Sequence, residues 1–328
     1  MTDGQAAAEP GTQLQAPGEA VRAAGGRAAL EWAVSFTEAE RLIRFAEGLR
    51  AADTDWPERL GLGGSGPGVL AGGRRPTRIH FGNEFCQRLL PSPAVLDSAL
   101  GAAAASGLAF GFVLPVLTDA GLETADRLLQ RLPEGTEVSV NDWGLMRRLS
   151  RRFPGLRPTA GRLLCRMLKE PRAPSAAYLQ LGGRGFMTPG LERLLDRFGV
   201  ERLEIDVPPF ARGQDLYAPR GRLSVHAPFG FVTTGRICRI GNLHRPMEHK
   251  FAAGHTCARE CLAYWCELTP GRGPDEAKMS IFQRGNTIFY RHTTAMDEAL
   301  AGAIAAGSID RLVISGDWHA DRRAPLGA

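Results

Sequence analysis

Short apolar runs alternate with amphipathic segments along most of the chain, which is the pattern of strands alternating with helices. The predicted strands cover residues 30–36, 78–81, 108–116, 137–140, 158–161, 202–207, 222–227, 231–234 and 311–315, with a hairpin over 281–290 around Gly285 and Asn286. The predicted helices begin at Thr37, in a capping box with Glu40, near Ser92, before Leu122, after Asn141, at Thr188 and near Met296.

Strands that alternate with helices indicate an α/β protein with a parallel sheet. About eight strand signals within one domain favour a (β/α)8 TIM-like barrel over residues 29–320. The expected helices are missing between residues 207 and 290, so the predicted barrel is irregular. A doubly wound open sheet is the alternative.

Three segments fall outside this pattern. Residues 1–28 are rich in Ala, Gly, Gln and Pro and are predicted to be a disordered tail, and residues 321–328 form a second tail. Residues 61–75 are glycine-rich and are predicted to be a flexible insertion without a helix. No Gly-Lys-Ser/Thr follows these glycines, which argues against a phosphate loop.

The net charge of +5 comes almost entirely from arginine, since Lys169, Lys250 and Lys278 are the only lysines. Excess arginine leaves a polyanion partner such as RNA open, although a mixed solvated surface explains it as well. No apolar run approaches the roughly 18 residues of a transmembrane helix, and no signal peptide is recognisable. We therefore expect a cytoplasmic protein without a membrane span.

Six cysteines are too few for a disulfide scaffold in a chain of 328 residues, and three of them lie within ten residues, at 257, 261 and 266. Cys86 follows the strand at 78–81 and Cys238 follows the strand at 231–234, so both are expected at one mouth of the barrel. Cys257 and Cys261 form a CxxxC pair that shares one face if the segment is helical. We therefore predict that Cys86, Cys238, Cys257 and Cys261 hold a metal centre.

Thiolates suit zinc or iron–sulfur clusters, and the dispersed positions favour a cluster over zinc. Two cysteines are left over. Cys266 could replace a ligand, whereas Cys165 fits a small core residue. His244, His249 and His255 lie between the cysteines and are predicted to be exposed or to lie near the metal rather than bind it.

The order of several short segments resembles the collagenase-like (U-thirty-two) peptidase family, and within it the UbiV-like branch. These segments are LEWAVSFTEAERLIRFAEGL from Leu30, IHFGNEFC ending at Cys86, VNDWG at 140–144, AGR at 160–162, GRIC ending at Cys238 and CAREC at 257–261. Together they span roughly residues 29–266. The family's His-Gly strand motif reads His226-Ala227 here.

This resemblance implies a barrel with a [4Fe–4S] cluster on Cys86, Cys238, Cys257 and Cys261. It also implies a heterodimer with a UbiU-like paralogue that acts in oxygen-independent hydroxylation during ubiquinone biosynthesis. Other relatives hydroxylate RNA bases or are called peptidases. Such a barrel would take an aromatic substrate beside the cluster.

Four further residues near predicted strand ends could orient such a substrate, namely Asn141, Asp142, Arg162 and His226. The simpler interpretation is that they cap loops or helices, as Asp142 would at a helix start. A protease, a non-catalytic cluster scaffold and an RNA-modifying enzyme remain alternative functions. GxSxG and HExxH motifs are both missing, which argues against the protease.

Overall fold

In the computed structural model, the residues described are 29–51, 55–64, 66–71, 73–165, 167–170, 175, 177, 187–218, 221–252, 256–268 and 279–317. The two predicted tails, the end of the domain at 318–320 and His255 lie outside these residues.

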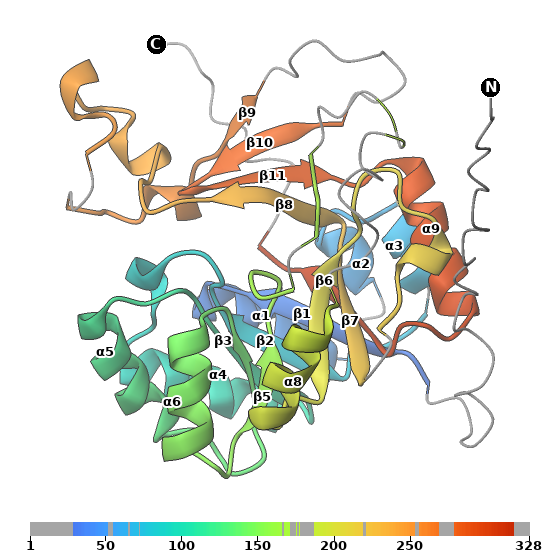
Figure 1. The fold of residues 1–328 in the computed structure, drawn as a ribbon, viewed down its shortest axis with the longest axis horizontal. Coiled ribbons are helices and arrows are strands. Elements are labelled where there is room, and N and C mark those ends of the chain that lie inside the picture. Colours follow the sequence, from blue (N-terminus) through green and yellow to red (C-terminus); the bar gives the residue numbers. More distant parts are fainter. Residues whose placement is uncertain are drawn as a thin grey trace, which may run out of the picture.

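Eight parallel strands close into a barrel in the order β1-β12-β7-β6-β5-β4-β3-β2 (Figure 1). They are β1 Glu31–Phe36, β2 Arg78–Gly82, β3 Ala109–Leu114, β4 Glu137–Val140, β5 Arg157–Ala160, β6 Arg202–Asp206, β7 Arg222–Ala227 and β12 Arg311–Ser315. Closure occurs where β1 pairs with β12, with Glu31 opposite Arg311 and Ser35 opposite Ser315. The predicted single-domain β/α barrel is confirmed, and the doubly wound alternative is excluded because the sheet has no open edge.

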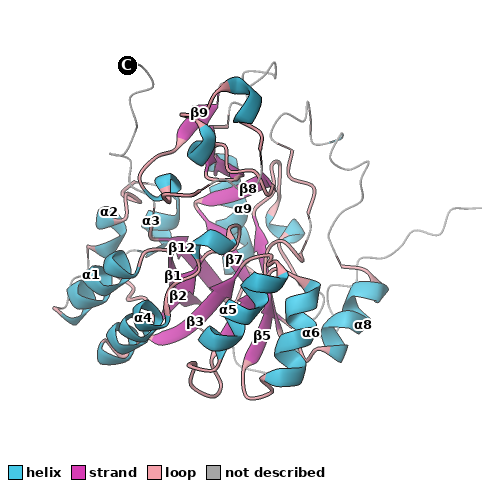
Figure 2. Cartoon of the chain, turned by 90° about the vertical axis from the view of Figure 1, so that its left-hand side faces the viewer, coloured by secondary structure: helices cyan, strands magenta, loops and turns pink. Residues whose placement is uncertain are grey.

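Helices surround the strands (Figure 2). They are α1 Ala39–Arg50, α2 Trp56–Arg59, α3 Gly66–Ala71, α4 Pro93–Ala105, α5 Asp119–Leu129, α6 Trp143–Arg152, α8 Pro189–Arg197 and α9 Thr294–Ala305. Short 3-10 turns are η1 Gln87–Leu89, η2 Gly213–Asp215, η3 Ile240–Asn242, η4 Met247–His249 and η5 Glu260–Leu262.

Sequence signals for helix starts succeed where a hydroxyl or carboxylate directly precedes the helix. The side chains of Ser92, Thr118, Asp142, Thr188 and Thr293 each accept a backbone N–H three residues on. The predicted capping box at Thr37 is wrong. The N-cap of α1 is Glu38, without a side-chain cap, and the Thr37 N–H donates instead to Asp317 Oδ2 at 2.7 Å.

The segment between β7 and β12 departs from a regular barrel, as the missing helix signals predicted. A separate antiparallel sheet, in the order β8-β11-β10-β9, lies across one end of the barrel (Figure 1). Its strands are β8 Phe229–Thr234, β9 Cys266–Leu268, β10 Ile281–Arg284 and β11 Thr287–Arg291. The run at 231–234 belongs to this sheet, so its assignment to the barrel is wrong, whereas the hairpin with Gly285 at φ +60° is confirmed.

Residues 61–75 contain a helix, contrary to prediction. Within the described part of this segment, α3 covers Gly66–Ala71, and Ala71 is fully buried. The neighbouring α2 buries Trp56, whose indole donates to the carbonyl of Arg74 at 2.8 Å. Packing against α9 and α2 thus offsets the low helix propensity of a glycine-rich stretch.

Barrel strands divide their side chains between two environments. Apolar residues such as Val34, Phe112 and Ile205 pack outward against the helices in one continuous core. Alternate residues face the lumen and are mostly polar; in β6 these are Arg202, Glu204 and Asp206, all buried. Most β/α barrels fill this space with branched apolar residues, so the polar lumen of this barrel is unusual.

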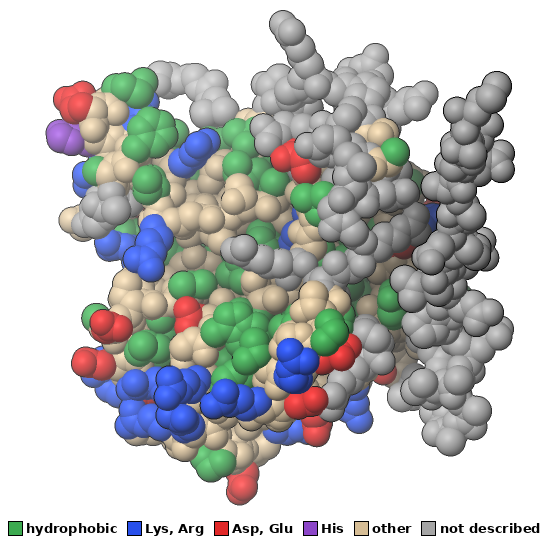
Figure 3. Space-filling view, in the orientation of Figure 1, with side chains coloured by type: hydrophobic (Ala, Val, Ile, Leu, Met, Phe, Trp, Pro, Cys, Tyr) green, Lys and Arg blue, Asp and Glu red, His purple; other side chains and the backbone are tan. Residues whose placement is uncertain are grey.

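Arginine side chains gather on one surface, over α5 and α6 (Figure 3). Within it, Arg148 and Arg152 both bind Asp126, with N–O distances of 2.5 Å. None of the described helices is long and apolar enough to cross a membrane.

Candidate metal centre and cavity

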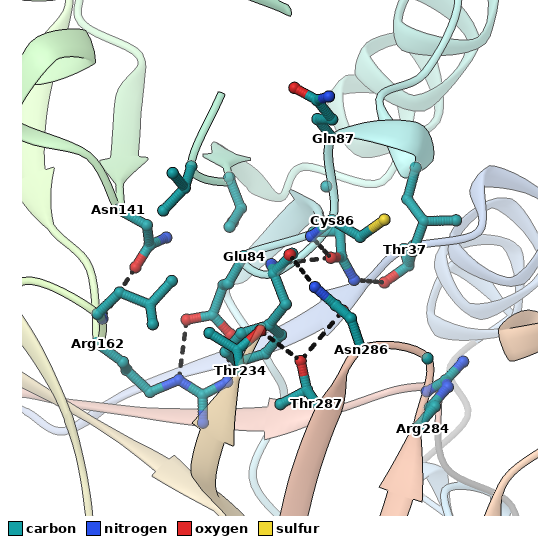
Figure 4. A pocket seen from close by; sticks show the side chains of 18 of the residues that line it. Thr37, Glu84, Cys86, Gln87, Asn141, Arg162, Thr234, Arg284, Asn286 and Thr287 are labelled. Atoms are coloured by element: carbon teal, nitrogen blue, oxygen red, sulfur yellow. Dashed lines mark hydrogen bonds and ion pairs between the residues drawn. The ribbon is translucent and has the colours of Figure 1, made fainter. Parts of the chain in front are cut away.

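A cavity of about 880 Å³ lies between the carboxyl ends of the barrel strands and the antiparallel sheet. The barrel contributes residues beyond β2, β4 and β5, and the sheet contributes residues around the hairpin turn at Gly285 (Figure 4). Four of the six cysteines line it, namely Cys86, Cys238, Cys257 and Cys261. The structure therefore brings together the four cysteines that the sequence selected.

Cys86 lies in a loop that side chains hold in place. Asn83 Oδ1 accepts the N–H groups of Phe85 and Cys86, both at 2.9 Å. Asn286, at the hairpin turn, donates to the carbonyl of Phe85 at 2.7 Å and to that of Gly235 at 2.6 Å (Figure 4). One side chain thus joins the loop that carries Cys86 to the loop that leads to Cys238.

Cys257 and Cys261 do not share the face of a helix. The helical prediction for this CxxxC segment is wrong, because Arg259 adopts a left-handed conformation at φ +60° and is followed by the short 3-10 turn η5. Cys261 lies against the hairpin, where Arg284 Nε donates to its carbonyl at 2.9 Å. A Cβ at Gly285 would lie 3.6 Å from Cys261 Sγ, so the turn leaves little space beside this sulfur.

Backbone N–H groups point at the sulfurs. The N–H of Gly241 donates to Cys238 Sγ at 3.2 Å, and the N–H of Arg259 donates to Cys257 Sγ at 3.3 Å. Cys86 accepts from the backbone of Arg88 and Leu89. Such bonds stabilise thiolates and are among the features that set cluster potentials.

The thiols also influence one another. Burial raises the pKa of Cys86 and Cys238, and that of Cys261 to about 12. Smaller contributions to these pKa values come from the other cysteines of the group, Cys257 included. These four cysteines therefore lie within electrostatic range of one another.

The remaining two cysteines do not line the cavity, although Cys266 packs against the small core formed by Leu89, Cys238, Ile240 and Cys261. Burial alone raises the pKa of Cys266, which lies in β9 and does not line the cavity. Cys165 is buried beside β5, and its thiol donates to the carbonyl of Ala160 at 3.5 Å. The exposed His244 and His249 also lie outside the cavity lining.

The predicted orienting residues all line the cavity, but they act differently from one another. Asp142 caps α6 through the N–H of Leu145 at 2.9 Å, as the simpler interpretation held. Asn141 donates to the carbonyl of Leu114 at 3.1 Å and accepts the N–H of Leu163 at 3.1 Å, so it connects the ends of β3 and β5. Gly161 is required here, since a Cβ would overlap the Asn141 amide.

Arg162 lies at the centre of a buried ion network. It binds Glu84 through two N–H groups and Asp206 Oδ1 at 2.6 Å, and Lys169 binds the other oxygen of Asp206. Burial disfavours the charged guanidinium, but the carboxylates outweigh it and raise the pKa of Arg162. Lys169 Nζ also lies 3.3 Å from the centroid of the Phe231 ring.

His226 contacts Glu204, with 3.4 Å between Nε2 and Oε2, and Ser139 donates to the same oxygen at 2.8 Å. Burial raises the pKa of Glu204, but the hydrogen bond and charge of His226 outweigh it, so the pKa is lowered. Burial lowers the pKa of His80 to about 3, so this imidazole is neutral at pH 7.

Sequence reasoning missed His80, Glu84, Lys169, Glu204 and Asp206. A signal was available in the alternation of polar and apolar residues in strands such as RLEIDV and RLSVHA. In a parallel barrel both faces of a strand are buried, so an alternating charged residue must point into the lumen.

A cluster of aromatic side chains lies on the sheet side of the cavity, and Phe85, Phe229 and Phe289 from this cluster line it. Phe85 packs against Phe231 and Phe289, with ring centroids 5.2 and 5.3 Å apart, and Phe282 stacks on Phe289. Tyr290 fastens this sheet to the barrel by donating to the carbonyl of Val207 at 2.6 Å.

These features define a class of protein, a β/α barrel with four clustered thiols beside a cavity whose floor is charged. No family model matches the chain, and no curated protein matches its sequence. Among solved structures, a U32 peptidase is similar over 90% of this chain and 95% of its own, at 11% identity and a TM-score of 0.39. At this identity and TM-score the similarity does not establish a family, so the resemblance to the U-thirty-two peptidases stays a prediction.

Two glycoside-cleaving barrels are similar to a comparable degree. An N-acetylglucosaminidase of glycoside hydrolase family 18 from Paenibacillus barengoltzii matches at 11% identity and a TM-score of 0.34, over 89% of this chain and 97% of its own. A chitinase from Trichuris suis matches at 8% identity and a TM-score of 0.30, over 74% and 84%. The residues that line the cavity are therefore the basis for a functional proposal.

Proposed function

We propose that the chain binds a [4Fe–4S] cluster on Cys86, Cys238, Cys257 and Cys261. The observation that carries this proposal is that four thiols from separate segments line one cavity within electrostatic range of one another, with N–H groups directed at three of the sulfurs. Thiolates are the usual ligands of such clusters.

Spacing supports a cluster over zinc. Tetrahedral zinc with Zn–S bonds of about 2.3 Å holds its sulfurs roughly 3.8 Å apart. All six cysteines are described, yet no three of their sulfurs lie within 4.8 Å of one another. A four-iron cluster binds each thiolate at a different iron and suits this wider arrangement.

We further propose an oxygen-independent hydroxylation enzyme, or its obligate subunit, that acts on an aromatic small molecule in quinone biosynthesis. The aromatic side chains and the charged floor favour a planar substrate with a polar end. In net terms, an aromatic C–H becomes C–OH with water as the oxygen source, and two electrons and two protons leave. The bound cluster would pass the electrons singly to a one-electron acceptor protein.

A partner subunit is part of this proposal. Leu243, Met247, Phe251 and Tyr264 are exposed in the segment that also carries Cys257 and Cys261, with Met247 exposed to 67%. Apolar side chains gathered beside a redox centre favour docking of another protein. We infer a paralogue of the UbiU-like kind. Co-expression followed by size-exclusion chromatography tests this, and Met247→Lys should weaken the heterodimer.

Anaerobic reconstitution tests the cluster. We expect about four irons and four sulfides per chain and visible charge-transfer absorption. Serine replacement of Cys86, Cys238, Cys257 or Cys261 should remove most of the iron, whereas the matched Cys266→Ser and Cys165→Ser variants should keep it. Loss in Cys266→Ser together with retention in Cys86→Ser would show that the ligand set is wrong.

Three alternatives make different predictions. A protease would cleave peptides as metal-free protein, which Cys→Ser variants would abolish. A scaffold would load the cluster without binding an aromatic substrate. An RNA-modifying enzyme would bind RNA in a salt-dependent way, but two of the four arginines of α6 are already paired with Asp126.

A further inference from the structure

Three buried side chains converge at the floor of the cavity. Glu84, Glu204 and His226 each offer one ligand atom, and these atoms lie within 4.8 Å of one another. They come from the loop after β2, from β6 and from β7. The barrel thus brings together two carboxylates and an imidazole from distant parts of the sequence.

Beside them are two polar atoms without partners. His80 Nδ1 and Glu204 Oε1 are buried and have no hydrogen bond to any of the described residues. They lie 3.8 Å apart, on side chains that are 3% and 1% exposed. Buried polar atoms are almost always bonded, so two neighbouring atoms without hydrogen bonds favour a ligand at this place.

Glu204 also differs from the other carboxylates of the lumen. Glu84, Asp206, Glu31 and Glu137 each bind an arginine, whereas the basic side chains within 4 Å of Glu204 in the described structure are the imidazoles of His80 and His226, of which His80 is neutral. Glu204 therefore presents a buried carboxylate oxygen, Oε1, that has no hydrogen-bond donor among the described residues and that a bound cation would satisfy.

Glu84 retains capacity for such a cation. Both of its oxygens accept from Arg162, but each carboxylate oxygen has a second lone pair. Asp206 binds the same Arg162 guanidinium, and its negative charge reduces the repulsion between this guanidinium and a nearby cation. Farther down the lumen, Arg78, Arg202 and Arg311 face Glu31 and Glu137.

We propose that Glu84, Glu204 and His226 bind one divalent first-row transition metal ion. An imidazole nitrogen together with two carboxylates forms a donor set typical of Mn²⁺, Fe²⁺ or Zn²⁺ rather than Ca²⁺. Ser139 orients the Glu204 carboxylate by donating to Oε2 at 2.8 Å, as partners of metal ligands commonly do.

The site opens toward the substrate space. His80, Glu84 and His226 line the cavity that the four cysteines also line. An exchangeable coordination position would therefore face the cavity, where a substrate carboxylate or hydroxyl oxygen could bind. No cysteine takes part, so this ion is separate from the proposed cluster and can be tested separately.

Equilibrium dialysis of the full chain against Mn²⁺, followed by electron paramagnetic resonance, tests the proposal. The wild-type chain should bind one Mn²⁺. Glu204→Gln and His226→Gln should each weaken binding about 100-fold, since even loss of an outer partner costs 10–100-fold. The matched controls are the exposed Glu201→Gln and His244→Gln, which should bind like the wild type.

Ser139→Ala provides a milder variant if ligand substitutions impair folding, and it should weaken Mn²⁺ binding by roughly 10-fold. Wild-type protein that binds no more Mn²⁺ than Glu204→Gln would overturn the proposal, because a proton or water would then satisfy Glu204. Iron and sulfide measured in the same samples distinguish the two sites, since loss of Mn²⁺ with an intact cluster affects this proposal alone.

Discussion

The buried carboxylates at the two ends of the barrel lumen have different partners. At the amino end of the strands, Arg311 binds Glu31 at 2.6 Å and Glu137 at 2.7 Å, and Arg78 binds Glu31 at 2.8 Å. Toward the carboxyl end, Arg162 and Lys169 pair with Glu84 and Asp206. Glu204 instead contacts two imidazoles and the Ser139 hydroxyl, and among the described residues its Oε1 and His80 Nδ1 have no hydrogen-bond partner.

This difference suggests that the amino end of the lumen serves mainly stability and that the carboxyl end serves function. Paired groups at the amino end satisfy one another and require nothing further from solvent or ligand. Incompletely paired groups at the carboxyl end are costly unless something binds them, and in β/α barrels this is the end where active sites lie. We therefore expect substitutions at the two ends to change different measurements.

Breaking the amino-end network should have the largest effect on stability. Arg311→Met leaves Arg78 as the remaining arginine beside the partly buried Glu31 and Glu137, and should lower the free energy of unfolding by ~3–5 kcal/mol. Urea unfolding measures this. Arg157→Met, which removes the exposed pair with Glu201, is the matched control and should cost at most about 1 kcal/mol. Equal losses in both variants would contradict the proposed difference.

Acid should weaken the same network. Burial raises the pKa of Glu137, but the hydrogen bonds and charge of Arg311, together with the charge of Arg78, outweigh it and hold the pKa at about 2. A lowered carboxyl pKa stabilises the fold fully above pH ~4.5, and this stabilisation disappears as the pH falls toward 2. We expect up to ~3 kcal/mol of pH-dependent stability that Glu137→Gln lacks, measured by urea unfolding across this range. A variant with the wild-type pH profile would refute this role of Glu137.

Removing the cap of α6 should have a modest effect. Asp142→Ala loses the bond to the Leu145 N–H and should destabilise the protein by ~1 kcal/mol, whereas Asp142→Asn should retain most of the cap. Thermal unfolding measures both. If Asp142→Asn lost substrate binding while keeping wild-type stability, Asp142 would have a role in the cavity beyond capping.

The smallest stability change is expected at the carboxyl end. Glu204→Gln removes a buried charge whose basic neighbours in the described structure are imidazoles rather than arginines, and it keeps a group that can bond Ser139, so stability should change by less than about 1 kcal/mol. Urea unfolding in the absence of added metal measures this. A loss as large as that of Arg311→Met would show that the two ends do not differ in the proposed way.

Local patterns predicted much of the fold. Helix starts at Ser92 and Thr188 and the hairpin at Gly285 follow from short-range chemistry. Predictions failed where a distant contact decides the outcome. Asp317 accepts the N–H of Thr37, and packing against α9 and α2 stabilises a helix in the glycine-rich segment at 66–71.

For the candidate site, the sequence likewise predicted the cysteines but not their arrangement. Clustering and strand-end positions selected Cys86, Cys238, Cys257 and Cys261 without a structure. Their geometry could not be predicted, because the left-handed Arg259 and the hairpin place Cys257 and Cys261. Glu84 and Glu204 are 120 residues apart, and no local pattern connects them.

By itself, the sequence determined that this chain is a β/α barrel with a group of chemically distinctive thiols, because periodicity and residue type are local properties. Only the tertiary structure decided which charges meet inside the lumen and which of them lack partners. Barrel closure brings every second residue of distant strands to one axis, and the pairing that results depends on register between strands rather than on position along the chain.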